Sequence, residues 1–386
     1  MSSRGSGSGD VPELLSNDPD GFGWGVLHDR TPKLIARVRD AHPYGPDQRR
    51  ALDALLDEIT SGTMRPLDER AHDHSTWETW GAAHFGKPWG DAPFLWWESY
   101  FYRRLLEAIG FFAPGPWRGI DPFESWKTAE LHGAGAEADL AALDGDAPGE
   151  WQVKLRAALW GNQADLGFRI GAVDGPEQPG GMVADDAARL WAALGRAGKI
   201  SIVADNAGRE LLADLVLIDH LLRTEAAATV TLHLKPWPYY VSDATTADMI
   251  ACLRRLTTAG GEAENVSRRL TEAIGEGRLR PYTHDFHCAP WSFHRMPADL
   301  AEEFRTSRLT LLKGDLNYRR LVGDRAWPPT TPFAEVTAYF PSPVAALRTL
   351  KSDVVTGIDP VTLARLDASG RDWRTDGAHG LIQARL

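Results

Sequence analysis

The sequence predicts an α/β fold in which helices cover both faces of a mostly parallel sheet. From residue 199 onward, short apolar or β-branched runs alternate with helical stretches, the alternation typical of such sheets. A second observation is that polar side chains follow directly after several of these runs, where α/β sheets hold their functional sites. The expected strands are 200–204, 229–234, 308–312 and 336–340, and the expected helices between them include 210–223 and 246–256.

The part of the chain before this region is expected to be helical. Apolar residues recur at spacings of three to five in 49–60 and 94–112, which indicates amphipathic helices that pack together. We expect a disordered tail and entry loop over 1–26, a helical N-terminal subdomain over 27–170 and an α/β metal-binding catalytic domain over 171–386. The glycine alternation at 21–25 is expected to be a turn, and the Gly-, Ala- and Asp-rich stretch 133–149 a loop between helices.

Composition narrows the classes of partner. The chain has 386 residues, 43% of them hydrophobic, with a formal net charge of -11, and this acidic balance argues against nucleic acid as a partner. Two cysteines are too few for a disulfide framework, and no run of 18 or more apolar residues or N-terminal apolar segment is present. We therefore expect a cytoplasmic protein without a membrane partner. The oligomeric state is left open.

The most informative segment is 199–210, in which a strand ends at the adjacent Asp205 and Asn206 and a helix follows at once. A carboxylate beside a carboxamide offers oxygen ligands and no soft ligand, which suits a hard cation such as Mg²⁺ or Mn²⁺. Asp243 follows the next strand in the same way, and it would lie above the same crevice if the two strands are neighbours. The sequence therefore predicts a metal site at Asp205 and Asn206, with Asp243 above the same crevice if that condition holds.

A third strand end, after 308–312, carries Lys313, Asp315, Asn317 and Arg319 in one loop. A lone Asp or Asn before a helix is more often an N-cap. Three polar strand ends together favour a functional site instead.

These segments carry a resemblance to a known family. The chain resembles the DUF89 damage-control phosphatases, and its Arg-Thr-x-Lys element is similar to that of the subfamily that includes acidic residue methyltransferase 1 and the yeast sugar-phosphate phosphatases. The similarity runs from about residue 30 to about residue 357. The segments that match are 205–210 with Asp214, 313–319, 348–351, 97–104 and 159–166.

The resemblance implies a three-layer α/β/α, Rossmann-like domain with a helical N-terminal subdomain. It also implies a divalent metal cofactor (Mn²⁺, Mg²⁺, Co²⁺ or Ni²⁺) and hydrolysis of phosphate monoesters of small metabolites, with sugar phosphates as the expected class. Carried over by motif, the metal ligands and catalytic residues are Asp205, Asn206 and Asp243. The residues expected to bind substrate are Asp315, Leu316, Asn317, Tyr318, Arg319 and Lys351, with Glu98, Asn162 and Asp165 in matching motifs. Arg209 departs from the family pattern and would either join the phosphate pocket or face solvent.

The chemistry requires such residues. A phosphate monoester repels anionic nucleophiles, so its hydrolysis needs a cation on the nonbridging oxygens and a positioned nucleophile. We favour metal-activated water, with Lys351 and either Arg319 or Lys313 neutralising the remaining charge. Attack by Asp205 itself, forming an aspartyl phosphate, is the other route. The alternative function is an S-adenosylmethionine-dependent protein carboxyl methyltransferase, although the first strand leads to Asp-Asn rather than to a Gly-rich loop.

Overall fold

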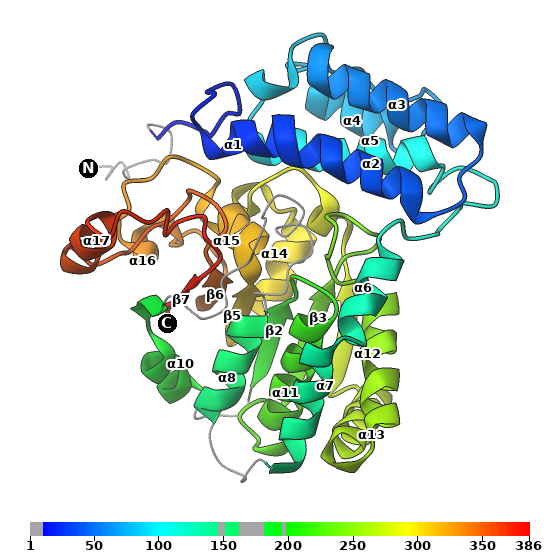
Figure 1. Cartoon of the computed structure of the whole chain (residues 1–386). Coiled ribbons are helices and arrows are strands. Elements are labelled where there is room, and N and C mark those ends of the chain that lie inside the picture. Colours follow the sequence, from blue (N-terminus) through cyan, green and yellow to red (C-terminus); the bar gives the residue numbers. More distant parts are fainter. Residues whose placement is uncertain (1–10, 146–150, 162–180, 195–197) are drawn as a thin grey trace.

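The computed structural model describes residues 11–145, 151–161, 181–194 and 198–386. Within these residues a seven-stranded sheet lies at the centre of the molecule, with the strand order β1-β7-β6-β5-β2-β3-β4 (Figure 1). The five strands from β6 to β4 run parallel to one another, whereas β7 is antiparallel to β6, and β1 runs with β7. The strands are β1 (Gly181–Asp185), β2 (Lys199–Val203), β3 (Thr229–Leu234), β4 (Leu279–Thr283), β5 (Leu309–Lys313), β6 (Val344–Thr349) and β7 (His379–Arg385).

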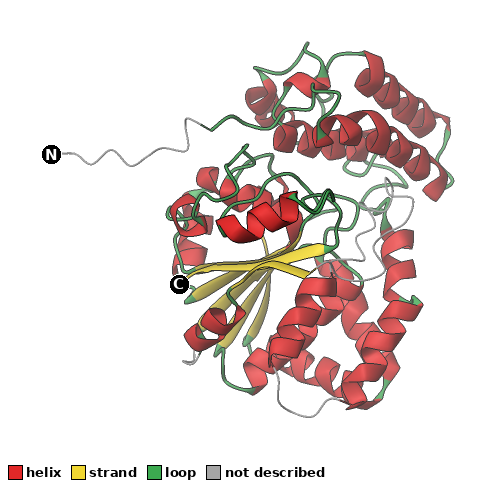
Figure 2. Ribbon diagram, turned by 60° about the vertical axis from the view of Figure 1, so that its left-hand side comes forward, coloured by secondary structure: helices red, strands yellow, loops and turns green. Residues whose placement is uncertain are grey.

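Helices cover both faces of the sheet (Figure 2). Strand side chains point alternately to the two faces, so Ile200 and Ile202 of β2 contribute to one hydrophobic core and Val203 to another. The three-layer α/β/α class expected for this chain is confirmed. The first face is covered by α8 (Trp151–Trp160), α10 (Ala187–Ala193), α11 (Arg209–Arg223), α12 (Thr246–Ala259) and α13 (Gly261–Gly275), and the second by α14 (Ala298–Arg305), α15 (Gly314–Val322), α16 (Phe333–Val336) and α17 (Pro360–Asp367).

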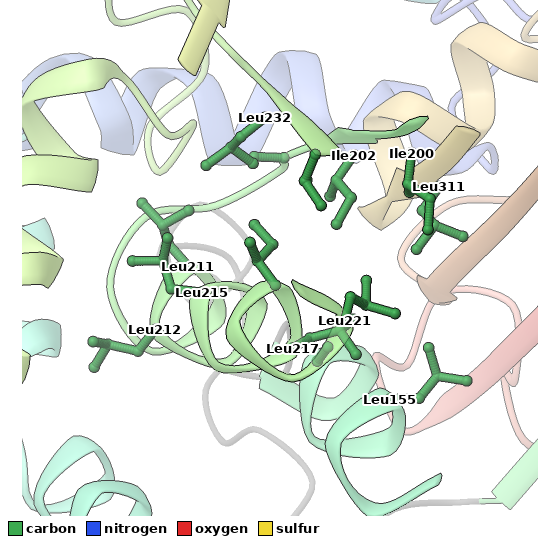
Figure 3. Close-up of a cluster of buried hydrophobic side chains, with 14 of the residues drawn as sticks. Leu155, Ile200, Ile202, Leu211, Leu212, Leu215, Leu217, Leu221, Leu232 and Leu311 are labelled. Carbon is green, nitrogen blue, oxygen red and sulfur yellow. The ribbon is translucent and has the colours of Figure 1, made fainter. Parts of the chain in front are cut away.

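The helix α11 is central to the first face. Figure 3 shows its leucines lying against strand residues such as Ile202 and Leu232, with Leu155 of α8 beside the same helix. Burying a leucine side chain contributes roughly 1.5–3 kcal/mol, so this row of contacts fixes the start of α11 under the end of β2. Asn206 and Glu210 are positioned by that junction.

The N-terminal helices form a separate core above the carboxyl end of the parallel strands (Figure 1). Its centre is α5, in which 13 of 16 residues are buried, and which ends at Gly110 with a positive φ of 82°, a conformation that glycine adopts without strain. The helices of this group are α1 (Phe22–Gly25), α2 (Thr31–Ala41), α3 (Pro46–Ser61), α4 (His74–Gly81) and α5 (Phe94–Ile109).

The next two helices, α6 (Glu124–Leu131) and α7 (Ala134–Ala142), contribute with α8 to the core on the first face of the sheet. Their buried residues in this core include Leu131, Leu140 and Leu155. These helices therefore pack with the sheet layer, while Trp126 of α6 also packs against the N-terminal core. The domain boundary near residue 170 stays a prediction.

Three local expectations need correction. The stretch 133–149 contains α7 and a 3₁₀ turn at Leu143–Gly145 rather than only a loop, since its alanines favour helix; residues 146–150 lie outside the described part. The expected turn at 21–25 contains the short helix α1. Residues 336–340 are not a strand: Val336 ends α16, and 337–340 form a turn that buries Phe340. The strand in this region is β6, which begins at Val344.

None of the helices in the described part of the chain combines the length and apolar character that a bilayer span requires.

Two histidines are buried in contact with each other, His233 in β3 and His287 in the turn after β4. His233 Nδ1 lies 3.2 Å from His287 Nε2, and His233 Nε2 lies 3.3 Å from the Ser201 hydroxyl. Burial lowers the pKa of His233 to about 3. Burial, followed by the neighbouring His233, lowers the pKa of His287 well below its usual value. Both rings therefore stay uncharged in the folded protein at neutral pH.

This pair predicts acid destabilisation. The unfolded chain takes up protons at these histidines near pH 6.5, whereas the folded chain does not, so stability is full above that pH and falls below it by about 1.4 kcal/mol per pH unit for each histidine. In His287→Gln, the slope of the unfolding free energy between pH 6.5 and 5 should drop by about that amount, measured by urea denaturation. An unchanged slope would show that His287 is protonated in the folded state.

Candidate active site

The carboxyl ends of four neighbouring strands bring the predicted site residues together. β2 pairs with β3 on one side and with β5 on the other, and β5 pairs with β6. The condition that placed Asp243 near Asp205 is thus met, and an isolated antiparallel bridge joins Asn206 to Asp243 directly. Parallel strands deliver their following residues to one edge, where open α/β sheets have their crevice.

A cavity of about 70 Å³ opens at this edge. By the measure that a buried water needs about 10–15 Å³, it has room for an ion and several waters. Its lining includes most of the residues predicted from the sequence, namely Glu98, Asp205, Asn206, Asp243, Asp315, Leu316, Arg319 and Lys351. The sequence did not single out its other members, which are Phe22, Arg30, Phe94, Tyr102, Tyr240, Val241, Ser242 and Ser352.

Asp205 is held by a close approach of the backbone. It is 4% exposed, and a Cβ atom built on Gly314 would overlap its carboxylate. Gly314 has φ +80°, which a residue with a side chain rarely adopts. Glycine at the start of α15 therefore allows β5 and the end of β2 to meet at the site.

Asn206 is held at both ends of its carboxamide. Its Nδ2 donates to Asp205 Oδ2 at 3.2 Å and to Glu210 Oε2 at 3.0 Å, and its Oδ1 accepts from the Ser242 hydroxyl at 2.8 Å. A carboxamide oxygen has two lone pairs, so Oδ1 retains one beyond the bond from Ser242.

Asp243 is 2% exposed and is held from behind. The Tyr240 backbone N–H donates to its Oδ2 at 3.2 Å, and the Lys235 ammonium lies 3.6 Å from the same oxygen. Its backbone carbonyl accepts from Lys127 at 2.9 Å. These contacts fix the loop between β3 and α12, and with it the position of the carboxylate.

The donor set suits a hard cation. Asp205, Asn206 and Asp243 present two carboxylates and one carboxamide oxygen at one cavity, and carboxylate and amide oxygens are ligands that Mg²⁺ and Mn²⁺ accept. In the described ranges, no group of three or more His, Cys, Asp or Glu side chains is arranged to hold a metal. The third oxygen of the predicted set comes from an asparagine.

Glu98 reaches the cavity from α5 and contacts two arginines. Its Oε1 accepts from Arg30 at 2.6 Å, and its Oε2 accepts from Arg319 at 2.9 Å and from the Tyr240 hydroxyl at 3.2 Å. Burial disfavours the Arg319 charge, but Asp324 and Glu98 outweigh it and hold the pKa of Arg319 well above its usual value. Glu98 therefore orients cationic groups at the cavity, while direct contact with a substrate stays a prediction.

The Arg-Thr-x-Lys element forms one wall. The Asp315 Oδ1 atom accepts from Arg348 Nε at 2.7 Å and from the Lys351 backbone N–H at 3.1 Å. The Ser352 hydroxyl donates to the same oxygen at 3.1 Å. Arg348 thus fixes Asp315 and the turn after β6, and this turn brings the Lys351 side chain to the cavity lining.

Several predicted residues lie elsewhere. Asn317 donates to the carbonyls of Ala204 and Lys313, and the Tyr318 hydroxyl lies 3.0 Å from both Thr356 Oγ1 and Gln383 Oε1, so both side chains are in the core beneath the cavity. Asn162 and Asp165 lie outside the described residues. The substrate contacts predicted for these four stay predictions.

Two basic residues that the sequence left as phosphate contacts face away from the cavity. Lys313 donates to Glu210 at 3.0 Å and to Asp214 at 2.6 Å. Burial opposes its charge, but these carboxylates raise the pKa of Lys313, whereas burial, and then the Glu210 charge, raise the pKa of Asp214 to about 7. Arg209 pairs with Asp139 of α7 at 2.7 Å and does not line the cavity.

Of the cavity residues in the N-terminal group, the sequence analysis predicted Glu98 and missed the others. Arg30, Phe22 and Tyr102 lie in helical segments far from any strand end, so the strand-end pattern could not find them. Tyr240 lies in the Pro-punctuated loop before Asp243, and its position in that loop was the one available signal.

Comparison with known proteins gives three findings. The family model described as the damage-control phosphatase ARMT1-like domain matches residues 26–365. Damage-control phosphatase ARMT1 of Mus musculus is 28% identical over 431 residues, which cover 96% of this chain and 97% of the relative; that of Danio rerio is 29% identical over 434 residues, with 96% of each chain covered. A solved DUF89 family protein from Pyrococcus horikoshii covers 88% of this chain and 92% of its own, with 14% identity and a TM-score of 0.47.

The fold and the cavity define an α/β protein with a polar site at the carboxyl edge of its sheet. Because the family model spans most of the chain, the protein belongs to the ARMT1-like family of damage-control phosphatases. The resemblance read from the motifs is confirmed.

The approach of Gly314 to Asp205 predicts a large effect of one methyl group. Gly314→Ala forces a side chain into a positive φ, at roughly 1–2 kcal/mol, and into overlap with the carboxylate, at roughly 1–3 kcal/mol more. Gly86→Ala is the matched control, because Gly86 has the same φ of +80° with no neighbouring atom within 4 Å. Urea denaturation should show a loss of about 2–5 kcal/mol for Gly314→Ala and about 1–2 kcal/mol for Gly86→Ala. Equal losses would contradict the close approach.

Proposed function

We propose that the protein is a metal-dependent phosphatase that hydrolyses phosphate monoesters of small metabolites, with sugar phosphates as the substrate class. One observation carries the proposal: a single cavity is lined by the oxygens of Asp205, Asn206 and Asp243 and by the cationic side chains of Arg319 and Lys351. Membership of a damage-control phosphatase family supports it. A cytoplasmic location, expected from the sequence, is part of the same proposal.

The charges around the cavity favour a metal cofactor. The lining contains four carboxylates and three cationic side chains, a formal balance of -1: Glu98, Asp205, Asp243 and Asp315 against Arg30, Arg319 and Lys351. A cavity with a net negative charge does not attract a phosphate monoester dianion, whereas one bound divalent cation would make the net charge of the cavity positive. The cation would be Mn²⁺, Mg²⁺, Co²⁺ or Ni²⁺.

Asp205, Asn206 and Asp243 would hold this cation. When bound, it would supply charge neutralisation at the phosphate oxygens and lower the pKa of a water nucleophile. Arg319 and Lys351 would bind the remaining phosphate oxygens through charge-assisted hydrogen bonds. Since Glu98, Asp324 and Asp315 already fix these cations or their backbone, little reorganisation would be needed as charge develops in the transition state.

The rest of the lining favours a small polyhydroxylated substrate. Phe22, Phe94, Tyr102 and Tyr240 provide aromatic walls, and such surfaces pack against the C–H faces of a sugar. The carboxylates of Glu98 and Asp315 are acceptors for sugar hydroxyls.

Metal dependence is the first test of the proposal. EDTA treatment followed by desalting should abolish phosphate release from p-nitrophenyl phosphate and from a sugar phosphate, and Mn²⁺, Co²⁺, Ni²⁺ or Mg²⁺ should restore it. Asp205→Ala should lower kcat on the order of 10³-fold or more, because metal stabilisation of the transition state contributes several kcal/mol.

Full activity of the stripped protein would contradict the metal proposal. If Asp205→Ala keeps activity within tenfold of the parent, Asp205 has a structural role and no catalytic one. Tight, metal-independent binding of S-adenosylmethionine together with methyl transfer to a protein carboxylate would favour the methyltransferase alternative.

Lys351 tests phosphate binding separately from metal binding. Lys351→Ala should lower kcat/KM by roughly 10- to 100-fold, since a charge-assisted hydrogen bond contributes about 1.5–3 kcal/mol, and the Mn²⁺ Kd should stay within about twofold because the lysine is not a ligand. Lys87→Ala, which removes an exposed lysine outside the cavity, serves as the control. A parent-like kcat/KM for Lys351→Ala would remove the residue from the phosphate site.

A further inference from the structure

A buried carboxylate stands directly behind Asn206. Glu210, one turn into α11, is 1% exposed, and its Oε2 accepts from Asn206 Nδ2 at 3.0 Å. Its other oxygen, Oε1, accepts from the ammonium of Lys313 at 3.0 Å. Glu210 does not line the cavity, so neither substrate nor metal would contact it.

The two ends of the Asn206 carboxamide are chemically different. An ammonium has donors only and an ionised carboxylate has acceptors only, so the bond from Lys313 leaves Glu210 to accept from Asn206. The end of the amide that faces Glu210 is therefore NH₂. Asp205 Oδ2, 3.2 Å from the same nitrogen, imposes the same orientation.

That orientation decides whether Asn206 serves as a ligand. A hard cation binds the carboxamide oxygen and not its NH₂ group, which is a donor without an available lone pair. With the NH₂ turned toward Glu210, Oδ1 lies on the side of Ser242, which lines the cavity. Rotation by 180° would present NH₂ to the cation and set the amide oxygen against two carboxylates.

We propose that Glu210 is a positioning residue that fixes the Asn206 carboxamide with its oxygen toward the metal site, with Lys313 holding Glu210 in place. The inference rests on the proposed metal-dependent function and deepens it. Lys313 would then hold Glu210 in place and would not make the phosphate contact that the sequence led us to expect.

The test is the affinity for Mn²⁺ alone, measured by calorimetric titration of metal-stripped protein. Glu210→Gln keeps the size of the side chain, but its amide donates as well as accepts, so both orientations of Asn206 become possible. The Mn²⁺ Kd should rise by about 10- to 100-fold, the usual effect of losing a partner behind a metal ligand.

Asp214→Asn is the matched control. Asp214 is the other carboxylate on Lys313 and is equally buried, yet it contacts neither Asn206 nor the cavity. Its variant should unfold at lower urea concentration while the Mn²⁺ Kd stays within about twofold of the parent. Equal weakening of Mn²⁺ binding in both variants would overturn the inference, because the lost ion pair would then explain it.

A second test, in which Glu210→Gln is combined with Asn206→Asp, decides the question if Glu210→Gln alone folds poorly. In Asn206→Asp both ends of the side chain are oxygens, so orientation no longer matters, and adding Glu210→Gln should leave Mn²⁺ affinity unchanged or improve it by removing a carboxylate neighbour. A 10-fold or larger further loss in that double variant would overturn the inference. If the parent protein and Glu210→Gln bind Mn²⁺ with the same Kd, the inference is overturned but the proposed function stands. If the parent protein binds no divalent metal, the proposed function itself is refuted.

Discussion

The structure depends on one buried contact between its two groups of elements, the guanidinium of Arg319. Arg319, on α15, donates to Glu98 of α5 and to both carboxylate oxygens of Asp324, and it lies over the ring of Phe94 at 4.2 Å. Asp324 in turn accepts from the Leu95 backbone N–H at the start of α5. Breaking a buried pair of this kind costs roughly 3–5 kcal/mol, so the N-terminal helices are fixed over the sheet edge at the point where the cavity opens.

This contact explains why the cavity combines residues from distant parts of the chain. The sheet edge supplies Asp205, Asp243, Asp315 and Lys351, whereas the N-terminal group supplies Arg30, Glu98 and the aromatic side chains of Phe22, Phe94 and Tyr102. Glu98 belongs to both sets, because it accepts from an arginine of each group. A shift of α5 along the sheet edge would therefore move both arginines relative to the strand-end carboxylates.

The parts of the fold that the sequence predicted are those in which local pattern and tertiary role agree. β2, β3 and β5 lie in the middle of the sheet, are buried on both faces and consist mainly of apolar or β-branched residues, so the predicted bounds differ from the observed ones by at most one residue. β6 was not predicted because it contains Ala345 and Ala346, and alanine has a low strand propensity. β4 was not predicted because it contains Pro281, which is tolerated there since β4 is an edge strand and the missing N–H is not needed for pairing.

The same distinction holds for the site. Asp205, Asn206 and Asp243 follow strands, and the topology of a parallel sheet brings such positions together. The direction of a side chain is not contained in that rule. Lys313 and Asp315 are two residues apart in one motif, yet Lys313 extends under α11 to Glu210, whereas Asp315 lines the cavity, and only the packed positions of α11 and α15 determine this.

Several carboxylates at or behind the cavity pair with a cationic side chain. Lys235 lies beside Asp243, Arg348 beside Asp315, Lys313 beside Glu210, and Arg30 and Arg319 beside Glu98. Because a buried charge is costly when its partner is removed, each of these pairs contributes both to the shape of the site and to the stability of the fold. A fall in activity after loss of one partner therefore identifies a catalytic role only when the unfolding free energy of the same variant has been measured. The charges that prepare the cavity for a cation and a phosphate are thus also the charges that hold its walls together.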